Sequence, residues 1–228
     1  MIIAIDGPTA SGKSTVARML AQNLGYYYVC SGLLYRALAY LLITHYGYTE
    51  HTVINVKPED IAACFDPQEF SYIYLPLKDS QERIFFNQED ITPHLKDSVI
   101  DKITSITSTN LYVRHFVTTL QRSFARDHDI VIDGRDVGTA VFPDAQAKFF
   151  LTASIEVRAK RWLCDQKKRG NNFSVQQAIE KISDRDKRDK ERDIAPLAIS
   201  EDAFVVDNSN LNLQETFDLM LAYSKKRL

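Results

Sequence analysis

A glycine-rich stretch close to the N-terminus constrains the fold of this chain more than any other feature of its sequence. Residues 7–14 read Gly7-Pro8-Thr9-Ala10-Ser11-Gly12-Lys13-Ser14, a match to G-x-x-x-x-G-K-[S/T]. A short apolar run at residues 2–5, typical of a buried parallel strand, precedes this stretch, and a helical pattern at residues 15–24 follows it. Strand, loop and helix in this order predict a phosphate-binding P-loop within an α/β fold.

The chemistry of the P-loop predicts its ligand. Its glycines let several backbone N–H groups point at one anion, and the following helix adds the positive end of its dipole. Lys13 is expected to bridge the β- and γ-phosphates of a nucleoside triphosphate, with the Ser14 hydroxyl on Mg²⁺. Residues Gly7 to Thr15 are therefore predicted to bind ATP. A merely flexible surface loop is the alternative, and the strand–loop–helix setting disfavours it.

Strand-like and helix-like segments alternate along the rest of the 228 residues. Buried strands are predicted at residues 26–29, 130–132, 147–151 and 204–206, and helices at 33–46, 113–126, 155–168, 174–190 and 213–222. Ser174, with Gln177 three residues on, is a capping-box pattern. Residues 70–91 alternate with period two on either side of Lys78-Asp79-Ser80, which predicts an antiparallel hairpin turning there. The alternation predicts a parallel sheet covered by helices.

Charge and cysteine content exclude several classes of protein. The formal net charge of -2 argues against a general binder of nucleic acid or anionic membranes. Residues 158–192 are the exception, because they hold twelve Lys or Arg against six Asp or Glu and so favour a local anion. Cys30, Cys64 and Cys164 form no C-x-x-C pair, so neither a disulfide framework nor a zinc site is expected. With no leader pattern and no run near the ~20 apolar residues of a membrane helix, we expect a cytoplasmic protein.

A P-loop alone does not separate kinases from GTPases and motors. The base-reading N-K-x-D motif of GTPases is absent from the sequence. Arginines lie instead on or near predicted loops and in the basic segment: Arg36, Arg135, Arg185, Arg188 and Arg192. Each one alone is as readily a solvated surface side chain. Because arginine recognises phosphate in a planar, bidentate manner, together they predict a phosphoryl-transfer site.

Five stretches of the chain form a more specific pattern. They are Ile3-Ala4-Ile5-Asp6 running into the P-loop, Ser31-Gly32-Leu33-Leu34-Tyr35-Arg36-Ala37, Asp133-Gly134-Arg135-Asp136-Val137-Gly138-Thr139, Val141-Phe142-Pro143-Asp144-Ala145, and Arg185-Asp186-Lys187-Arg188-Asp189 leading to Ala195-Pro196-Leu197. Together they resemble bacterial-type cytidylate kinase over nearly the whole chain. The resemblance implies a P-loop nucleoside monophosphate (NMP) kinase fold: a five-stranded parallel sheet flanked by helices, an antiparallel β insertion in the NMP-binding region, and a short helical lid. It implies one domain, with its core at residues 1–31, 129–156 and 193–228, its NMP-binding region at 32–128 and its lid at 157–192.

The resemblance also implies roles for individual residues. It places Arg36 and Arg135 on the acceptor phosphate, Ser105, Arg114 and Asp136 around cytosine, Asp189 on the ribose, and Ser31 and Tyr35 in the same CMP site. Lys13, Arg135, Arg185 and Arg192 are the implied catalytic residues. An arginine paired with a carboxylate suits cytosine, whereas the carboxylate would face the O4 acceptor of uracil, which predicts discrimination against UMP. Ser105 as a locally bonded helix hydroxyl, and Asp186 and Arg188 as members of surface pairs along a helix, are the alternatives.

The metal site is the least constrained part of this prediction. Asp133 is expected to reach Mg²⁺ through water, with a strand-end cap as the alternative. The family usually has Asp where this chain has Cys30, so we expect a steeper Mg²⁺ requirement than is normal for the family.

The predicted reaction is ATP + CMP giving ADP + CDP, with dCMP as a second acceptor and the protein acting as a monomer. A kinase for another small acceptor, such as UMP or shikimate, is one alternative. A nucleotide-binding regulator without activity is the other.

Overall fold

Five strands form the parallel sheet of the computed structural model, which describes residues 1–75 and 81–227. The strands are β1 (Ile2–Asp6), β2 (Tyr27–Cys30), β6 (Ile130–Gly134), β7 (Ala147–Thr152) and β8 (Phe204–Asp207). Their order in the sheet is β2-β6-β1-β7-β8. Ile5 pairs with Asp133 and Asp6 with Gly134, so the loops that follow β1 and β6 leave the sheet at the same edge. The predicted parallel sheet is confirmed.

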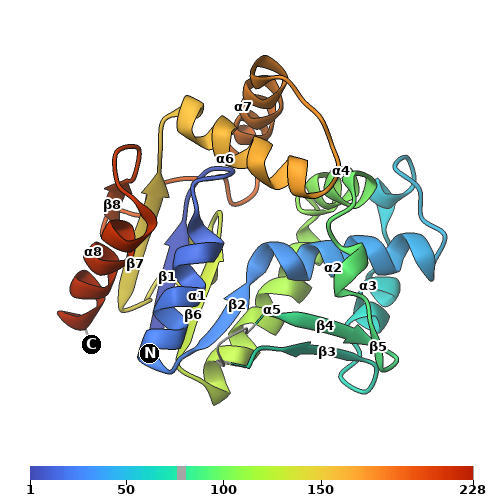
Figure 1. Cartoon of the computed structure of the whole chain (residues 1–228). Helices are drawn as coiled ribbons and strands as arrows, with labels where there is room; N and C mark the ends of the chain where they lie inside the picture. The colour runs from blue at the N-terminus through green and yellow to red at the C-terminus, as the bar shows by residue number, and fades with distance from the viewer. Residues whose placement is uncertain (76–80, 228) are drawn as a thin grey trace. The chain divides into compact units, whose positions relative to one another are not determined.

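The chain divides into two compact units, of which unit 1 comprises Met1–Tyr26 and Asp129–Leu228. Its helices are α1 (Lys13–Leu24), α6 (Ile155–Lys168), α7 (Val175–Glu191) and α8 (Leu213–Lys225). Figure 1 shows α1 and α8 side by side in front of β1 and β7, while α6 and α7 pair near the ends of these strands. The predicted capping box is present, because Ser174 and Gln177 each accept the other's backbone N–H at the start of α7.

Unit 2 comprises Tyr27–His128 and holds the smaller sheet. Its helices are α2 (Ser31–Thr44), α3 (Pro58–Cys64), α4 (Ser98–Thr107) and α5 (Leu111–Asp127), with 3-10 turns at Val53–Asn55 and Thr92–His94. Strands β3 (Phe70–Ile73), β4 (Arg83–Phe86) and β5 (Glu89–Asp90) form an antiparallel sheet in that order. This confirms the predicted antiparallel insertion. The turn predicted at Lys78-Asp79-Ser80 lies outside the described residues.

Besides the two 3-10 turns, helices α3 and α4 and a π-helical turn escaped the sequence analysis. Helix α4 is rich in Ile, Val and Thr, which are weak helix formers, and it begins where the Asp97 carboxylate accepts the N–H of Val99 at 2.7 Å. Helix α3 has only seven residues and relies on Pro58 in its first turn, together with the acidic Glu59 and Asp60. A π-helical turn at Val137–Val141 follows β6. None of the three shows a long apolar periodicity.

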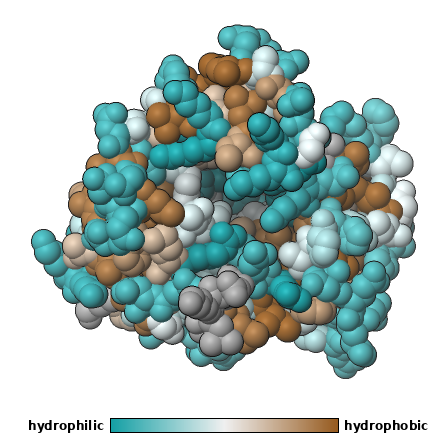
Figure 2. Space-filling model, in the orientation of Figure 1, coloured by the Kyte–Doolittle hydropathy of each residue, from teal (hydrophilic) through white to brown (hydrophobic). Residues whose placement is uncertain are grey.

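The surface of the molecule is largely polar on the face displayed in Figure 2, where hydrophobic side chains form small, separate patches. Among the described residues, no helix combines the length and the apolar character required to cross a membrane.

We predict that the central sheet dominates the stability of unit 1. Ile132 in β6 is fully buried, so Ile132→Ala should lower the free energy of unfolding by about 2–5 kcal/mol. Val205 in β8 is 47% exposed, and Val205→Ala should cost less than about 1 kcal/mol. Urea unfolding followed by circular dichroism would measure both values. Equal losses in the two variants would contradict this assignment of the core.

Candidate functional site

The P-loop connects β1 to α1 through a backbone that requires glycine at residue 7 and has positive φ angles at residues 10 and 12. A Cβ atom on Gly7 would lie 2.1 Å from the carbonyl oxygen of Leu151 in β7, so no other residue fits there. Gly12 has φ +94° at the N-cap of α1. Ala10 also has a positive φ of 59°. The loop therefore curls back over the start of α1, as the motif predicted.

Lys13 is folded back into this loop. Its Nζ atom donates to the carbonyl oxygen of Pro8 at 2.7 Å and to Oγ of Ser11 at 3.3 Å. The side chain is buried, and burial, assisted by the nearby Arg135 guanidinium, holds the pKa of Lys13 well below its usual range. A polyphosphate beside Nζ would reverse this shift, because opposite charge favours the ammonium form.

Ser14 and Asp133 meet at the carboxyl edge of the sheet. The Ser14 hydroxyl donates to Oδ2 of Asp133 at 2.9 Å, and Asp133 is buried at the end of β6. Within residues 1–75 and 81–227, no three His, Cys, Asp or Glu side chains gather as a metal-binding group. A hydroxyl next to one carboxylate nevertheless fits Mg²⁺, which keeps several waters and takes few protein ligands beside substrate phosphates.

Asp6 ties the end of β1 to the turn after β6. Its carboxylate accepts the backbone N–H groups of Val137 at 2.9 Å and Gly138 at 2.7 Å. Burial raises the pKa of Asp6 from 3.8 to about 6, against the opposing effect of the two amides and Lys13, and the nearby Asp136 raises it further. These bonds hold the π-helical turn and so position the two residues before it, Arg135 and Asp136.

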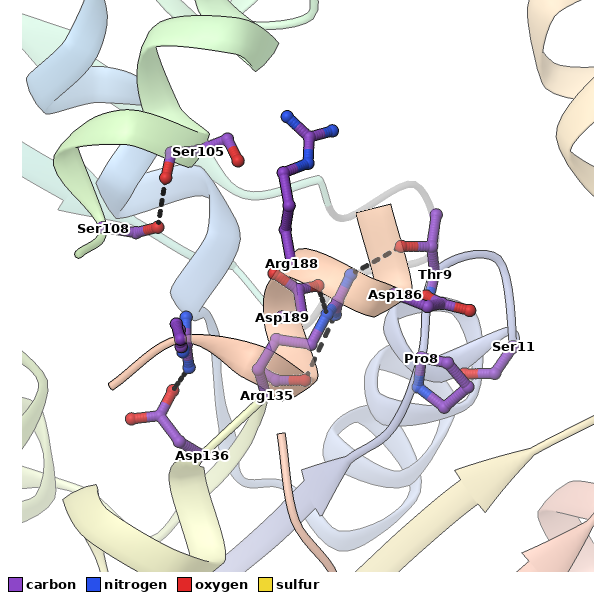
Figure 3. Close-up of polar contacts among 12 residues, drawn as sticks. Pro8, Thr9, Ser11, Ser105, Ser108, Arg135, Asp136, Asp186, Arg188 and Asp189 are labelled. Carbon is purple, nitrogen blue, oxygen red and sulfur yellow. Dashed lines mark hydrogen bonds and ion pairs between the residues drawn. The ribbon is translucent and has the colours of Figure 1, made fainter. Parts of the chain in front are cut away.

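Three of the predicted arginines of unit 1, Arg135, Arg185 and Arg192, lie near two carboxylates. Arg135 donates from Nε to Asp189 of α7 at 2.8 Å and from NH2 to Oγ1 of Thr9 at 3.3 Å (Figure 3). Arg192 donates from NH2 to Asp136 at 3.0 Å. Burial raises the pKa of Asp189, but the nearby guanidinium groups outweigh it and lower this pKa. Arg135 contributes most, followed by Arg185 and Arg192. Burial lowers the pKa of Arg135, but Asp189, together with Asp133 and Asp186, outweighs this effect and raises it.

Asp186 and Arg188 lie on the same helix, α7, but only one of them is buried. Asp186 is buried, accepts the backbone N–H of Thr9 at 2.9 Å and pairs with Arg158 of α6, so the alternative of a surface helix pair does not hold for it. Arg188 is exposed and donates to the carbonyl oxygen of Asp184 one turn earlier. Its guanidinium points away from Asp189 in Figure 3.

The predicted residues of unit 2 lie on α2, α4 and α5. Arg36 donates to the carbonyl oxygen of Leu95 at 3.0 Å and pairs with Asp101. The Ser31 hydroxyl accepts from Nε2 of Gln121 at 2.7 Å, and Gln121 is fully buried. Neither residue stood out in the sequence, because Asp101 lies in α4, which was not predicted, and Gln121 belongs to an ordinary amphipathic helix.

Arg114 and Ser105 lie near the junction of α4 and α5. Arg114 donates to the carbonyl oxygen of Ser108 at 3.1 Å, and its guanidinium lies 5.9 Å from the centre of the Tyr35 ring. The backbone carbonyl of Ser105 accepts from the Ser108 hydroxyl at 3.1 Å. These contacts hold Arg114 in a fixed orientation next to Tyr35.

Sequence comparisons with known proteins agree on one family. A family model described as cytidylate kinase matches residues 3–226. A cytidylate kinase of Thermodesulfovibrio yellowstonii is 41% identical over 96% of this chain and 96% of its own length. One from Halalkalibacterium halodurans is 37% identical over 100% of this chain and 99% of its own length. The crystal structure of an uncharacterized protein from Eubacterium ventriosum matches with a TM-score of 0.52 at 16% identity, covering 100% of this chain and 99% of that one, which supports the fold alone.

The raised pKa of Asp6 generates a pH-dependent stability. A carboxyl group with a pKa of about 6 when folded and 3.8 when unfolded contributes stability that is present below pH 3.8 and is lost as the pH rises through 6. At about 1.4 kcal/mol per pKa unit, the wild-type free energy of unfolding should fall by up to about 3 kcal/mol relative to Asp6→Asn between pH 4 and pH 7. Urea unfolding of both proteins across this range would test it. Parallel pH profiles would contradict the assignment.

Proposed function

The chain belongs to the cytidylate kinase family, and from this premise we propose that it transfers the γ-phosphoryl group of ATP to CMP, giving ADP and CDP. It is an ATP-dependent phosphotransferase, and we propose dCMP as a second acceptor. The observation that carries the proposal is the arrangement of cations in unit 1. Lys13 lies buried inside the P-loop, and three arginines act together on Asp189.

The donor would lie on the P-loop. Backbone N–H groups of residues 7–15 and the N-terminus of α1 would hold the phosphates of ATP. Lys13 would exchange the Pro8 carbonyl and the Ser11 hydroxyl for the β- and γ-phosphates. We propose Mg²⁺ as the cofactor, held by Ser14 directly and by Asp133 through water, and a bound Mg²⁺ supplies neutralisation of phosphate charge.

The acceptor phosphate would be held by Arg36 and Arg135. Its second pKa is near ~6, so the attacking oxygen is already largely ionised at neutral pH and no catalytic base is needed. Arg135, Arg185 and Arg192 would neutralise the charge that spreads over the transferred group. Catalysis then consists of positioning and charge neutralisation.

The base and sugar of CMP would be read by separate groups. We propose that Ser105, Arg114 and Asp136 contact cytosine, with Ser31 and Tyr35 in the same site, and that Asp189 binds the ribose. The contacts of Arg114 with Ser108 and Tyr35 support this role, because a guanidinium held before binding loses less entropy when the ligand arrives.

We further propose how the protein works as a whole. It would act as one domain, with residues 32–128 as the NMP-binding region and residues 157–192 as the lid. It would act as a cytoplasmic monomer. Kinases for UMP or shikimate remain the competing activities.

Acceptor specificity provides the direct test. With ATP and Mg²⁺, coupled ADP formation should be rapid with CMP and dCMP and slow with UMP, AMP and shikimate. Asp136→Asn should reduce the CMP-to-UMP ratio of kcat/KM by about tenfold, because an amide can donate to O4 of uracil. Asp144→Asn, in an exposed loop, is the matched control. Preferred turnover of shikimate or UMP by the wild type would overturn the acceptor assignment.

Metal dependence tests the proposed consequence of Cys30. If a missing carboxylate weakens Mg²⁺ binding, Cys30→Asp should lower the Mg²⁺ concentration for half-maximal rate by about tenfold. Cys164→Asp makes the same change at an exposed position of α6 and should leave the rate profile unaltered. An unchanged Mg²⁺ profile in Cys30→Asp would show that the departure at residue 30 does not affect the metal.

A further inference from the structure

A buried ion pair holds one residue of the P-loop by both of its backbone polar groups. Oδ1 of Asp186 accepts the N–H of Thr9 at 2.9 Å, and Oδ2 pairs with the Arg158 guanidinium. Arg158 donates to the carbonyl oxygen of Thr9 at 3.1 Å and to that of Ala153 at 3.0 Å. Asp186 and Arg158 are each more than 90% buried. Figure 3 shows Asp186 beside Thr9 at the crest of the loop.

Apolar packing reinforces these bonds. Ala10 packs against a small core formed by Ala159 of α6 and Ala178 and Ile182 of α7. From α6, Arg161 donates to the carbonyl oxygen of Ser11 at 3.2 Å. Thr9, Ala10 and Ser11, which we name the arch, are therefore held by α6 and α7 through polar and apolar contacts.

The same stretch of α7 carries groups proposed to bind the acceptor. Asp189 lies three residues beyond Asp186, a rise of only about 4.5 Å along one helical turn. It holds Arg135, whose NH2 group also reaches the Thr9 hydroxyl. A displacement of Thr9 relative to Asp186 is thus transmitted over a short, rigid distance to Asp189 and Arg135.

Donor binding acts at the other side of the arch. Lys13 now donates to the carbonyl oxygen of Pro8, the residue directly before Thr9. A triphosphate that takes over Nζ releases this carbonyl, so occupation of the P-loop changes the forces on the arch. Stability alone is a weak explanation for the ion pair, because apolar residues of similar volume often replace buried pairs without loss.

We propose that Asp186 and Arg158 are positioning residues that couple the occupied P-loop to Asp189 and Arg135, so that a bound ATP strengthens the binding of CMP. The inference rests on the proposed function for the identity of the two ligands. Neither residue touches the reacting atoms. Their effect is a coupling free energy between two sites, and such coupling is reciprocal.

Isothermal titration calorimetry tests the coupling without turnover. CMP is titrated into the protein alone and into the protein saturated with a non-transferable ATP analogue and Mg²⁺. In the wild type the analogue should tighten CMP binding at least about fivefold, the lower end of usual coupling. In Asp186→Asn and in Arg158→Lys the tightening of CMP binding should fall below about twofold. Either change weakens the hydrogen bonds to the backbone of Thr9, and neither introduces a larger side chain.

The matched control is Asp184→Asn, the same chemical change on an exposed position of α7, which should keep the wild-type factor. Because coupling is reciprocal, CMP must tighten binding of the analogue by the same factor as the analogue tightens binding of CMP. Circular dichroism confirms that each variant is folded. If the variants do not fold, hydrogen exchange on the wild type decides instead: CMP alone should slow exchange of the Thr9 amide.

Two results would overturn the coupling while leaving the proposed function intact. The first is that the analogue does not tighten CMP binding in a wild type that binds both ligands and turns over CMP. The second is that the analogue tightens CMP binding in the folded Asp186 and Arg158 variants as much as in the wild type. Unaltered Thr9 exchange on CMP binding would also contradict it. Failure of the wild type to bind or phosphorylate CMP would instead refute the proposed acceptor.

Discussion

The bond between Asp6 and the turn after β6 is the constraint on which the arrangement of unit 1 depends. Neighbouring parallel strands bring the P-loop and the Asp133–Asp136 segment to one edge, but the sheet offers no bonds to hold the turns beyond it. Asp6 supplies them by accepting the amides of Val137 and Gly138. Because the following turn is thereby fixed, Arg135 and Asp136 leave the sheet in set directions. Burial of this carboxylate is unfavourable by itself, as its raised pKa shows.

Arginines proposed to bind phosphate are already paired in both units. Arg135 pairs with Asp189, Arg192 with Asp136, and Arg36 with Asp101. Each pairing screens the cation from its neighbours and limits its rotamers before a ligand arrives. An incoming phosphate must compete with a carboxylate, so part of its binding energy is used to rearrange these pairs. Arginine suits this exchange, since its five donors can serve a carboxylate and a phosphate together.

Much of this could be predicted from the sequence, because the decisive signals were local. The P-loop pattern fixed a strand, a turn and a helix, and continuous apolar runs located the other parallel strands. The roles of Asp186, Asp101 and Gln121 could not be predicted. Thr9 and Asp186 are 177 residues apart, and no pattern within α7 distinguishes the buried Asp186 from the exposed Asp184. Helix α4 was missed because its propensity is poor, and burial of Ile100 and Ile103 stabilises it instead.

Cys30 has a local electrostatic context within unit 2. Its backbone N–H donates to the Tyr72 hydroxyl at 2.9 Å, and that hydroxyl donates to the carbonyl oxygen of Tyr28 at 3.1 Å. Burial first, and then electrostatic interactions with Cys30 and Glu82, raise the pKa of Tyr72. Glu82 is itself buried, so this neighbourhood already contains one carboxylate. An aspartate at residue 30 would place a second carboxylate in this neighbourhood, whereas the thiol of Cys30 does not.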